Sequence, residues 1–419
     1  MFDKNKFTEK LLTAISGMYS DTEAAVERYT NAVESFFSVY GETDDFSVFS
    51  VAGRSEICGN HTDHNHGQVV AASIDLDIIA VAKKTSGTLI RVKSEGFDED
   101  KVDISSLEPV ESEKFRSSAL IRGVCDGIIK EGGKAGAFCA YTTSKILKGS
   151  GLSSSAAFED MIGTIENHLY NGGKYDFTKI SMISQYAENR FFGKPCGLMD
   201  QIACAAGGFV HIDFADPKNP VTERIEFSPE KFGYSLCIVN TGGSHADLND
   251  DYASVPAEMK AVAHFFGKDV LCGLTKADIV SNAKALRETV GDRAILRALH
   301  FISENERVCR ISEYIAKGDI KGFLSVINES GRSSATLLQN YYSTKAPSEQ
   351  GIGLACAIAE SVMGGGGACR VHGGGFAGTA QVFVPKDKEN EFIRAMECAF
   401  GEGSVTKLMV RPMGAVKVI

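Results

Sequence analysis

The segment with the clearest chemical meaning is the glycine- and serine-rich stretch 149–157, which reads Gly-Ser-Gly-Leu-Ser-Ser-Ser-Ala-Ala. Apolar residues follow it from Phe158 to Leu169 at i, i+3, i+4, i+7 and i+11, the spacing of one helix face. A glycine loop that opens a helix presents free backbone N–H groups and the positive end of the helix dipole, and both attract anions such as phosphate. No lysine follows the second glycine, so the stretch is not a Walker A loop. A flexible linker is the alternative interpretation, and its position between a predicted strand and a predicted helix argues against that.

A second polar segment, 59–67, reads Gly-Asn-His-Thr-Asp-His-Asn-His-Gly and follows a predicted strand. Its carboxylate, amide and imidazole groups can exchange hydrogen bonds with sugar hydroxyls, which favours a polyol-binding loop. A metal site built from His61, Asp63, His64 and His66 is an alternative, although this spacing fits neither a helix face nor a standard zinc motif. A solvated polar turn is the third interpretation.

A third group of residues surrounds Asp200, which lies in a glycine-bounded turn within Gly-Lys-Pro-Cys-Gly-Leu-Met-Asp-Gln (193–201). Glu188 lies late on the preceding predicted helix. Each carboxylate alone is unremarkable. Together with an anion-binding loop they supply a metal ligand and a group that orients or deprotonates a hydroxyl, as phosphoryl transfer requires. A serine at the helix start can also ligate magnesium, and a glycine run at 373–378 permits close backbone approach to a ligand.

Strands and helices alternate along both halves of the chain, which predicts an α+β or α/β architecture around these segments. In the first half, helices are predicted over the first forty residues and over 177–192, with Asp176 as the N-cap, and strands over 46–52, 74–82, 89–93 and 138–142. In the second half, strands are predicted over 235–239, 380–384, 407–410 and 415–419, and helices from Pro256 to 267 and over 389–400. The turn cluster 216–220 divides the chain into an N-terminal domain, 1–220, and a C-terminal domain, 221–419.

Composition excludes several classes of protein. A chain of 419 residues suggests two domains, and a net charge of −10 argues against a nucleic-acid partner. No apolar stretch approaches the length of a membrane span, and the first residues lack the apolar core of a signal peptide, so we expect a cytosolic protein. No two of the eleven cysteines have C-x-x-C spacing. We therefore expect reduced, mostly buried thiols, such as Cys139, Cys237 and Cys398.

The segments described above, taken in order, resemble the GHMP small-molecule kinases, and the galactokinases among them in particular. Gly53-Arg54 with Gly59 to Asp63 is similar to the family's sugar signature, and Gly149 to Ala156 to its ATP loop. Pro195 to Gln201 is similar to the catalytic segment, and Gly373 to Gly378 to the C-terminal glycine motif. The resemblance spans residues 10 to 415. It implies an α+β fold of two domains with the active site in the cleft between them.

The resemblance also implies an ATP-dependent kinase that phosphorylates the anomeric C1 hydroxyl of galactose and releases ADP. Asp200 would be the base or the hydroxyl-orienting group, with the Arg54 cation between it and the phosphates. The residues implied to bind ATP are Gly149, Ser150, Gly151, Leu152, Ser153, Ser154 and Ser155, with Ser94 on the nucleotide. Ser155 and Glu188 would hold Mg²⁺. The residues implied to line the sugar site are Asn60, His61, Thr62, Asp63, Gly197 and Tyr252.

The sequence departs from the family pattern around the sugar signature. Asn60 stands where galactokinases usually carry Glu, His64 stands where they usually carry Tyr, and 55–58 replaces a more apolar stretch that includes Asn. An amide in place of a carboxylate keeps an acceptor, adds a donor and removes a charge. The alternatives are therefore a 1-kinase for another galactose-like sugar or a pentose, and a sugar- and ATP-binding sensor without kinase activity. The sequence is compatible with a monomer and does not fix the oligomeric state.

Overall fold

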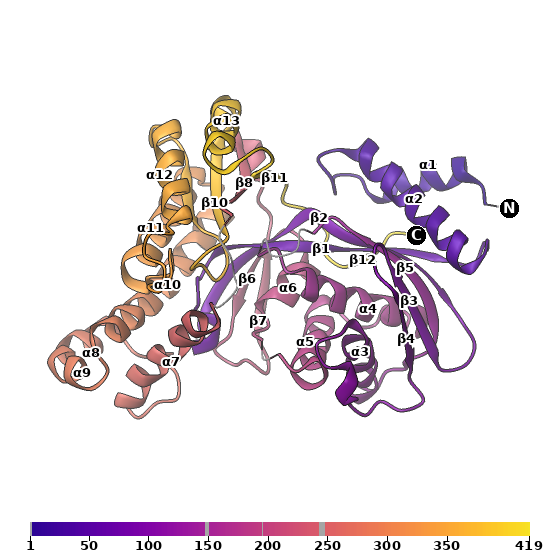
Figure 1. Cartoon of the computed structure of the whole chain (residues 1–419), viewed down its shortest axis with the longest axis horizontal. Coiled ribbons are helices and arrows are strands. Elements are labelled where there is room, and N and C mark those ends of the chain that lie inside the picture. Colours follow the sequence, from indigo (N-terminus) through magenta and orange to yellow (C-terminus); the bar gives the residue numbers. More distant parts are fainter. Residues whose placement is uncertain (1, 147–150, 195, 243–247) are drawn as a thin grey trace.

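Helices and two β-sheets make up the computed structural model, which describes residues 2–146, 151–194, 196–242 and 248–419. Within these ranges the larger sheet has the strand order β12-β1-β2-β5-β3-β4, and β6 also pairs with β2 and with β7. The smaller sheet has the order β11-β8-β10-β9 (Figure 1). Helices and strands occur in both halves of the chain, so the predicted α+β class is confirmed.

The strands of the larger sheet are β1 (Ser47–Cys58), β2 (Gln68–Lys84), β3 (Leu89–Ser94), β4 (Glu99–Asp103), β5 (Phe138–Ser144), β6 (Phe209–Asp213), β7 (Val221–Ile225) and β12 (Val416–Lys417). Those of the smaller sheet are β8 (Tyr234–Asn240), β9 (Ala368–Val371), β10 (Thr379–Pro385) and β11 (Val405–Leu408). The helices of the first half are α1 (Lys4–Ala14), α2 (Thr22–Tyr40), α3 (Ser117–Lys130), α4 (Ser154–Tyr170), α5 (Phe177–Ala187) and α6 (Met199–Ala206). Those of the second half are α7 (Asn249–Phe265), α8 (Lys276–Ser281), α9 (Ala283–Thr289), α10 (Asp292–Ala316), α11 (Ile320–Ser333), α12 (Gly351–Met363) and α13 (Glu389–Phe400).

The larger sheet is covered by helices on both faces. Successive strand residues point to opposite faces, so Val48 packs against α1 and α2 while Phe49 and Val51 join the core beneath α3 and α4. Ile78 and Ile79 on β2 divide between the same two cores. Figure 1 shows α1 and α2 on one side of this sheet and α3 to α6 on the other. This double covering explains why β1 and β2 are apolar on both faces.

The smaller sheet has the same two-sided arrangement. Val239 and Val382 pack against α12 and α13, whereas Ile238 and Phe383 belong to the core that also includes Phe323 of α11 and extends to the larger sheet. A shared apolar core therefore connects the two sheets.

A buried carboxylate ties the chain ends to the larger sheet. Asp77 on β2 is paired with Arg28 of α2 at 2.7 Å and with Arg411 at 3.0 Å, and Tyr19 donates to it. Two guanidinium groups compensate the buried charge of Asp77, and they come from the first and last parts of the chain. The pairing fixes the N-terminal helices and the C-terminal segment on the sheet that carries β1.

Several predicted elements end elsewhere than expected. The strand predicted over 46–52 continues to Cys58, so Arg54 lies within β1 rather than after it. The helix predicted to start at Pro256 starts at Asn249, and this proline lies inside α7.

Cys398 is exposed, which corrects its prediction as a buried thiol, because it lies on the outer face of α13. All eleven cysteines are free, as expected.

The predicted domain division after residue 220 stays a prediction. β7 begins at Val221 and pairs with β6, and β12 near the C-terminus pairs with β1, so two short strands beyond 220 extend the larger sheet.

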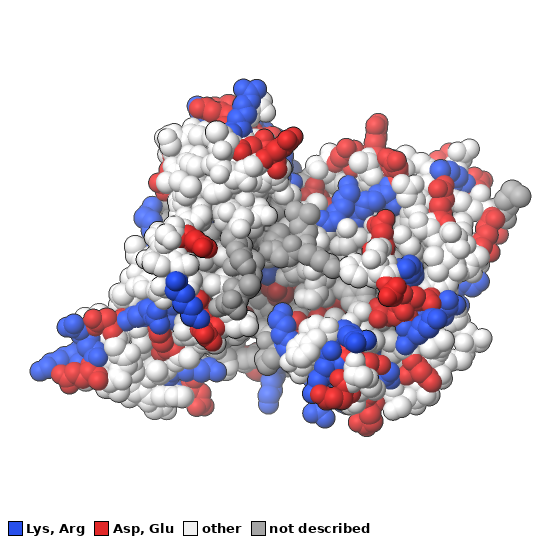
Figure 2. Space-filling model, in the orientation of Figure 1, with Lys and Arg blue, Asp and Glu red and all other residues white. Residues whose placement is uncertain are grey.

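No helix in the described ranges is both long and apolar enough to cross a membrane. Figure 2 shows acidic and basic side chains interspersed over one face of the molecule, with no large basic patch there.

Candidate active site

A cavity of about 400 Å³ collects most of the polar residues that the sequence singles out. Its walls come from β1, the loop that follows β1, the region 188–201, α7 and the glycine loop 373–374. Predicted site residues that line it are Arg54, Asn60, His61, Asp63, Ser155, Glu188, Gly197, Asp200 and Tyr252. Segments far apart in the sequence thus share one concave site of the size that small-molecule ligands occupy.

The central feature of this cavity is an ion pair between Arg54 on β1 and Asp200 in the first turn of α6. Nε and Nη2 of Arg54 lie 2.8 and 2.7 Å from Oδ1 of Asp200. The arginine side chain is 7% exposed and the aspartate 37%, so the aspartate is the partner open to the cavity. Burial raises the pKa of Asp200, but the Arg54 charge and a hydrogen bond from Ser153 outweigh burial and hold this pKa below its usual value. Asp200 is therefore an anion that can accept a hydrogen bond from a hydroxyl.

The loop before α4 is joined to this ion pair. Oγ of Ser153 donates to Oδ2 of Asp200 at 2.5 Å, and Nη1 of Arg54 donates to the carbonyl of Gly151. Gly151 and Ser153 have φ values of +69° and +60°, left-handed conformations that turn the chain into the helix. The first turn of α4 therefore lies beside the carboxylate, and the N–H groups of a first turn have no partner within their own helix. Gly149 and Ser150 of the predicted loop lie outside the described residues.

A second carboxylate, Glu188, opens the short π-helical turn η3 (Glu188–Phe192) that follows α5. Gln201 Nε2 donates to its Oε2 at 3.0 Å, and Lys194 Nζ lies 3.4 Å from its Oε1. Glu188 and Ser155 both line the cavity, so a carboxylate and a hydroxyl face the same space. Such hard oxygen donors suit a cation that keeps most of its coordination sites for water and phosphate oxygens.

Glu159 on α4 lies next to Glu188 and shares the Gln201 amide with it, at 3.2 Å. Burial, and then the Glu188 charge, raise the pKa of Glu159 well above its usual value. A carboxyl group kept protonated in this way adds no negative charge to this wall of the site.

On the opposite side of the site, His61 has φ +59° and its Nε2 donates to the carbonyl of Gly374 at 2.9 Å. Burial lowers the pKa of His61 to about 4, so the imidazole is neutral at pH 7. Asp63 faces Gly197 so closely that a Cβ at position 197 would lie 2.3 Å from Oδ2 of the aspartate. Tyr252 donates to the carbonyl of Gly375 at 3.0 Å. Asp63 and Tyr252 both line the cavity.

Two residues that the resemblance implies to bind the sugar, Thr62 and Asn60, are placed otherwise than it implies. Thr62 is fully buried, and its hydroxyl contacts the carbonyl oxygens of Gly59 and Gln68 at 2.8 and 2.6 Å, so it stabilises the loop and does not reach the cavity. Asn60 borders the cavity, but its side chain is fully buried and engaged by protein groups.

The histidine-rich loop is not a metal cluster. In the part of the chain that the structure describes, which includes His61, Asp63, His64 and His66, no group of three or more His, Cys, Asp or Glu residues is arranged to hold a metal ion. His61 is instead bonded to the backbone of Gly374. The alternative interpretation of this loop as a metal site therefore finds no support.

A second cavity, of about 1200 Å³, has Ser155 in its wall as well. Ser94 and Ser154 also line it, and Ser94 receives a hydrogen bond from Thr142 at 2.9 Å. Its apolar walls include Leu76, Ile78, Phe97, Phe115 and Phe158. An apolar pocket beside the start of a helix, where negative charge is favoured, suits a nucleotide base. Leu152 is buried in the core, so it can serve a ligand only through its backbone.

Sequence reasoning missed two charged groups of the smaller cavity, Glu56 and Lys194. Glu56 lies two residues after Arg54, and the period of a strand puts both side chains on one face. This alternation would have indicated Glu56 if the predicted strand had continued through position 56. Lys194 carried no such signal, because it lies in a loop.

Comparisons with known proteins identify the family of this chain. The galactokinase galactose-binding signature matches residues 34–84, and the N-terminal domain of GHMP kinases matches residues 119–208. A galactokinase of Actinobacillus pleuropneumoniae serotype 3 is 31% identical over 360 residues, which cover 85% of this chain and 90% of the relative. A galactokinase of Streptomyces coelicolor is 28% identical over 369 residues, 88% and 92% of the two chains. The chain belongs to the galactokinase family.

Solved structures show the same fold at lower identity. The Lactococcus lactis galactokinase, crystallised with galactose, superposes with a TM-score of 0.77 at 22% identity and covers 93% of this chain and 99% of its own. The mevalonate kinase of Methanococcus jannaschii gives a TM-score of 0.61 at 12% identity, covering 88% and 99%. The predicted GHMP kinase fold of this galactokinase-family enzyme is thereby confirmed.

Proposed function

We propose that this enzyme transfers the γ-phosphoryl group of ATP to the C1 hydroxyl of galactose, giving galactose 1-phosphate and ADP. The observation that carries the proposal is the position of the Arg54–Asp200 pair at the start of α4, where Ser155 lines both cavities. A sugar in the smaller cavity and a nucleotide in the larger one would meet there. The galactose-binding signature and the galactokinase relatives name the acceptor sugar.

In this reaction Asp200 accepts a hydrogen bond from the C1 hydroxyl and orients its oxygen toward the γ-phosphorus. The bond from C1 oxygen to phosphorus forms, the bond from the γ-phosphorus to the β,γ-bridging oxygen breaks, and the hydroxyl proton passes to Asp200. Because the pKa of Asp200 is held low, this proton moves late, after the sugar oxygen has begun to bond to phosphorus. Arg54 stabilises the carboxylate before transfer and the developing phosphoryl charge during it.

The backbone at Gly151 to Ser155 binds the triphosphate, and Ser94 contacts the nucleotide in the larger cavity. Ser155 and Glu188 are the residues that fit Mg²⁺, because a hydroxyl and a carboxylate oxygen face one space. The ion neutralises phosphate charge when it is bound. Asp63, Tyr252 and His61 bound the sugar side, with the His61 imidazole neutral.

The remaining expectations belong to the same proposal. Residues 1–220 form one domain with the sugar signature, the ATP loop and Asp200, and 221–419 form the second. Eleven free cysteines are in keeping with a reducing cytoplasm, where ATP is also available. We expect no nucleic-acid or membrane partner for a chain of net charge −10.

A panel of sugars tests the proposal. Purified enzyme is incubated with ATP, Mg²⁺ and galactose, galactosamine derivatives, other hexoses or pentoses, and ADP release is measured for each. We expect galactose to give the highest kcat/KM and the product to be a 1-phosphate. A higher kcat/KM for another sugar would replace galactose as the substrate, and binding of galactose and ATP without turnover would show a sensor.

A further inference from the structure

The wall of the smaller cavity beside Arg54 carries a second buried anion, Glu56. Alternation along β1 places Arg54 and Glu56 on the same face of the strand. The Glu56 side chain is only 5% exposed, yet it lines the cavity. Its Oε1 accepts hydrogen bonds from Nη2 of Arg370 at 2.6 Å and from Nδ2 of Asn60 at 3.0 Å. A buried carboxyl group is thus held in a defined position by a guanidinium and an amide.

The second oxygen of Glu56 has no such partner. Oε2 accepts no hydrogen bond from the described residues, and it is not among the buried atoms that lack one, so it has accessible surface in a residue that lines the cavity. Both protein donors approach the other oxygen. A carboxylate oxygen left open beside Arg54 is a strong acceptor for a hydroxyl that enters the cavity.

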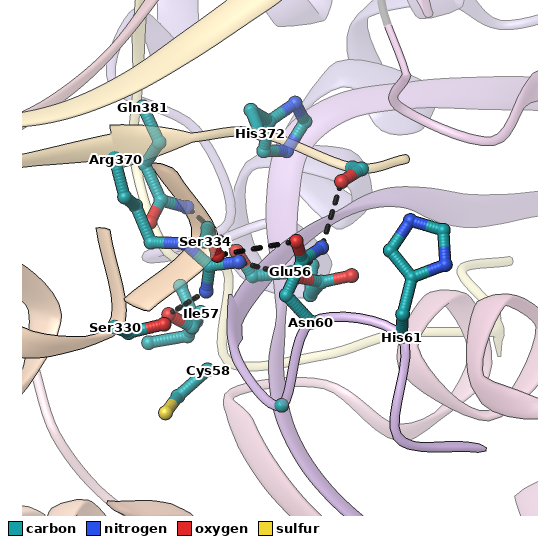
Figure 3. Close-up of polar contacts among 12 residues, drawn as sticks. Glu56, Ile57, Cys58, Asn60, His61, Ser330, Ser334, Arg370, His372 and Gln381 are labelled. Carbon is teal, nitrogen blue, oxygen red and sulfur yellow. Dashed lines mark hydrogen bonds and ion pairs between the residues drawn. The ribbon is translucent and has the colours of Figure 1, made fainter. Parts of the chain in front are cut away.

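The Asn60 side chain makes all of its hydrogen bonds within the protein, so it cannot accept a hydrogen bond from a sugar hydroxyl. Its Nδ2 donates to Glu56 and to the carbonyl of Gly373, at 3.0 and 2.8 Å. Its Oδ1 accepts from Asn340 at 2.8 Å and from Ser334 at 3.3 Å. An amide can make four such hydrogen bonds, and all four are made within the protein. Figure 3 shows the Glu56, Asn60, Ser334 and Arg370 side chains converging.

The charge at position 56 also explains the amide at position 60. A carboxylate at position 60 would lie within hydrogen-bond distance of Glu56, and two carboxylates so close cannot both stay ionised without a large cost. An amide there donates instead. Where galactokinases usually carry Glu, this chain therefore carries Asn, and the carboxylate stands four residues earlier in the sequence.

We propose that Glu56 is the carboxylate that reads a sugar hydroxyl in this enzyme, and that Asn60 and Arg370 are positioning residues that aim its free oxygen into the cavity. This proposal rests on the proposed function, since it assigns a specificity contact for the same sugar. It also predicts the class of acceptor. A buried anion favours neutral sugars with a hydroxyl at the contacted carbon and disfavours sugars that carry a carboxylate there.

Monodeoxy sugars identify the contact. Values of kcat/KM are measured for galactose and for its 2-, 3-, 4- and 6-deoxy derivatives with the wild type, E56Q and E56D. In the wild type we expect one deoxy sugar to lose at least about tenfold because it leaves the carboxylate unpaired. In E56Q that same penalty should shrink to about threefold or less, while KM for ATP stays within about twofold of the wild type. E56D keeps the charge that Arg370 requires, so it should fold even if E56Q does not, and it should reduce the same penalty by shortening the side chain.

A matched control is E113Q. Glu113 pairs with Arg122 in a similar, partly buried geometry at 2.7 Å but does not line either cavity, so its deoxy-sugar pattern should match the wild type. If E56Q and E56D lower kcat/KM for every sugar by one common factor, or leave all values unchanged, Glu56 does not read a hydroxyl. Wild-type enzyme that fails to phosphorylate galactose would instead refute the proposed function.

The positioning role of Asn60 has its own test. We expect N60E to raise KM for galactose at least about tenfold without changing KM for ATP, because it opposes Glu56. The matched control is N60Q, which has the length of N60E but keeps a neutral amide, so it should raise KM for galactose much less. Equal sugar KM values for N60E and N60Q would overturn the pairing.

Discussion

At the scale of single residues, the site depends on charges whose partners come from distant parts of the chain. Arg54 pairs with Asp200 from α6, and Glu56 pairs with Arg370 from β9. Removing one member of a buried pair leaves the other without compensation, so a loss of activity is informative only if folding is measured as well.

The substitution D200N tests the assigned role of the carboxylate. Asparagine keeps the shape of the side chain but cannot take the hydroxyl proton. We expect kcat to fall by about 10²- to 10⁴-fold while ATP still binds, measured by ADP release and by nucleotide titration. The same change at the exposed Asp216 serves as the control and should leave kcat unaltered. A D200N enzyme within a few-fold of the wild-type kcat would contradict the assignment.

Residue types alone predicted much of the candidate site but not its internal contacts. Arg54, Asp63, Glu188 and Asp200 lie in one cavity, as the resemblance implied. Asn60 was expected to contact sugar, and its side chain turns out to be engaged by Ser334, Asn340 and Gly373. These partners are distant in sequence, and no local pattern reveals them.

At the scale of elements, α4 serves two functions. Its first turn lies beside Asp200, and its buried side carries the acidic residues Glu159, Asp160 and Glu166. Burial raises the pKa of Glu166 to about 8, although the Gly136 N–H and the Cys125 thiol donate to it. The same helix therefore stabilises charge at its start and suppresses charge along its buried side.

The Glu166 carboxyl makes stability depend on pH. Its folded-state pKa is raised, so the folded protein binds the proton more tightly than the unfolded chain does. Its stabilisation is complete below the ordinary pKa of Glu and is lost as pH rises toward about 8. Relative to E166Q, the free energy of unfolding of the wild type should fall between pH 5.5 and 8, by up to about 1.4 kcal/mol per pH unit.

Urea unfolding of the wild type and E166Q at both pH values measures this difference. The exposed Glu108 provides the control variant E108Q, which should follow the wild type at both pH values. A gap between the wild type and E166Q that does not change with pH would disprove the assignment of the raised pKa.

Element boundaries were predictable where local signals are strong. The helix predicted over 389–400 matches α13, and Asp176 caps α5 as expected, accepting from Lys179 N–H. The end of β1 was not predictable in the same way. Arg54 and Glu56 look like loop residues in sequence, and only their buried partners in α6 and β9 make them tolerable within a strand.

At the scale of the whole molecule, the smaller cavity joins segments from both halves of the chain. β1 and α6 contribute Arg54 and Asp200, whereas α7 and the glycine loop contribute Tyr252 and Gly374. The alternation of elements predicted an α+β or α/β class, and the resemblance to GHMP kinases narrowed it to α+β. The pairing of β12 with β1 could not be read from the sequence, because it joins opposite ends of the chain.

A ligand that contacts both halves should stabilise the entire fold. We expect galactose at about one hundred times its dissociation constant to add about 2.7 kcal/mol to the free energy of unfolding. A thermal scan with and without galactose measures the rise in Tm. Sucrose at equal concentration controls for the general effect of an excluded solute. Equal rises with the two sugars would indicate that galactose does not bind the native state specifically.

The wall that Ser155 shares between the two cavities has a practical consequence for inhibitor chemistry. A single molecule that joins a galactose analogue through a short phosphate chain to adenosine would place one half on each side of Ser155. Tethering the two halves makes the second binding event intramolecular, and the effective concentration of a short linker reaches the millimolar range. Such a bisubstrate compound should bind far more tightly than either half alone.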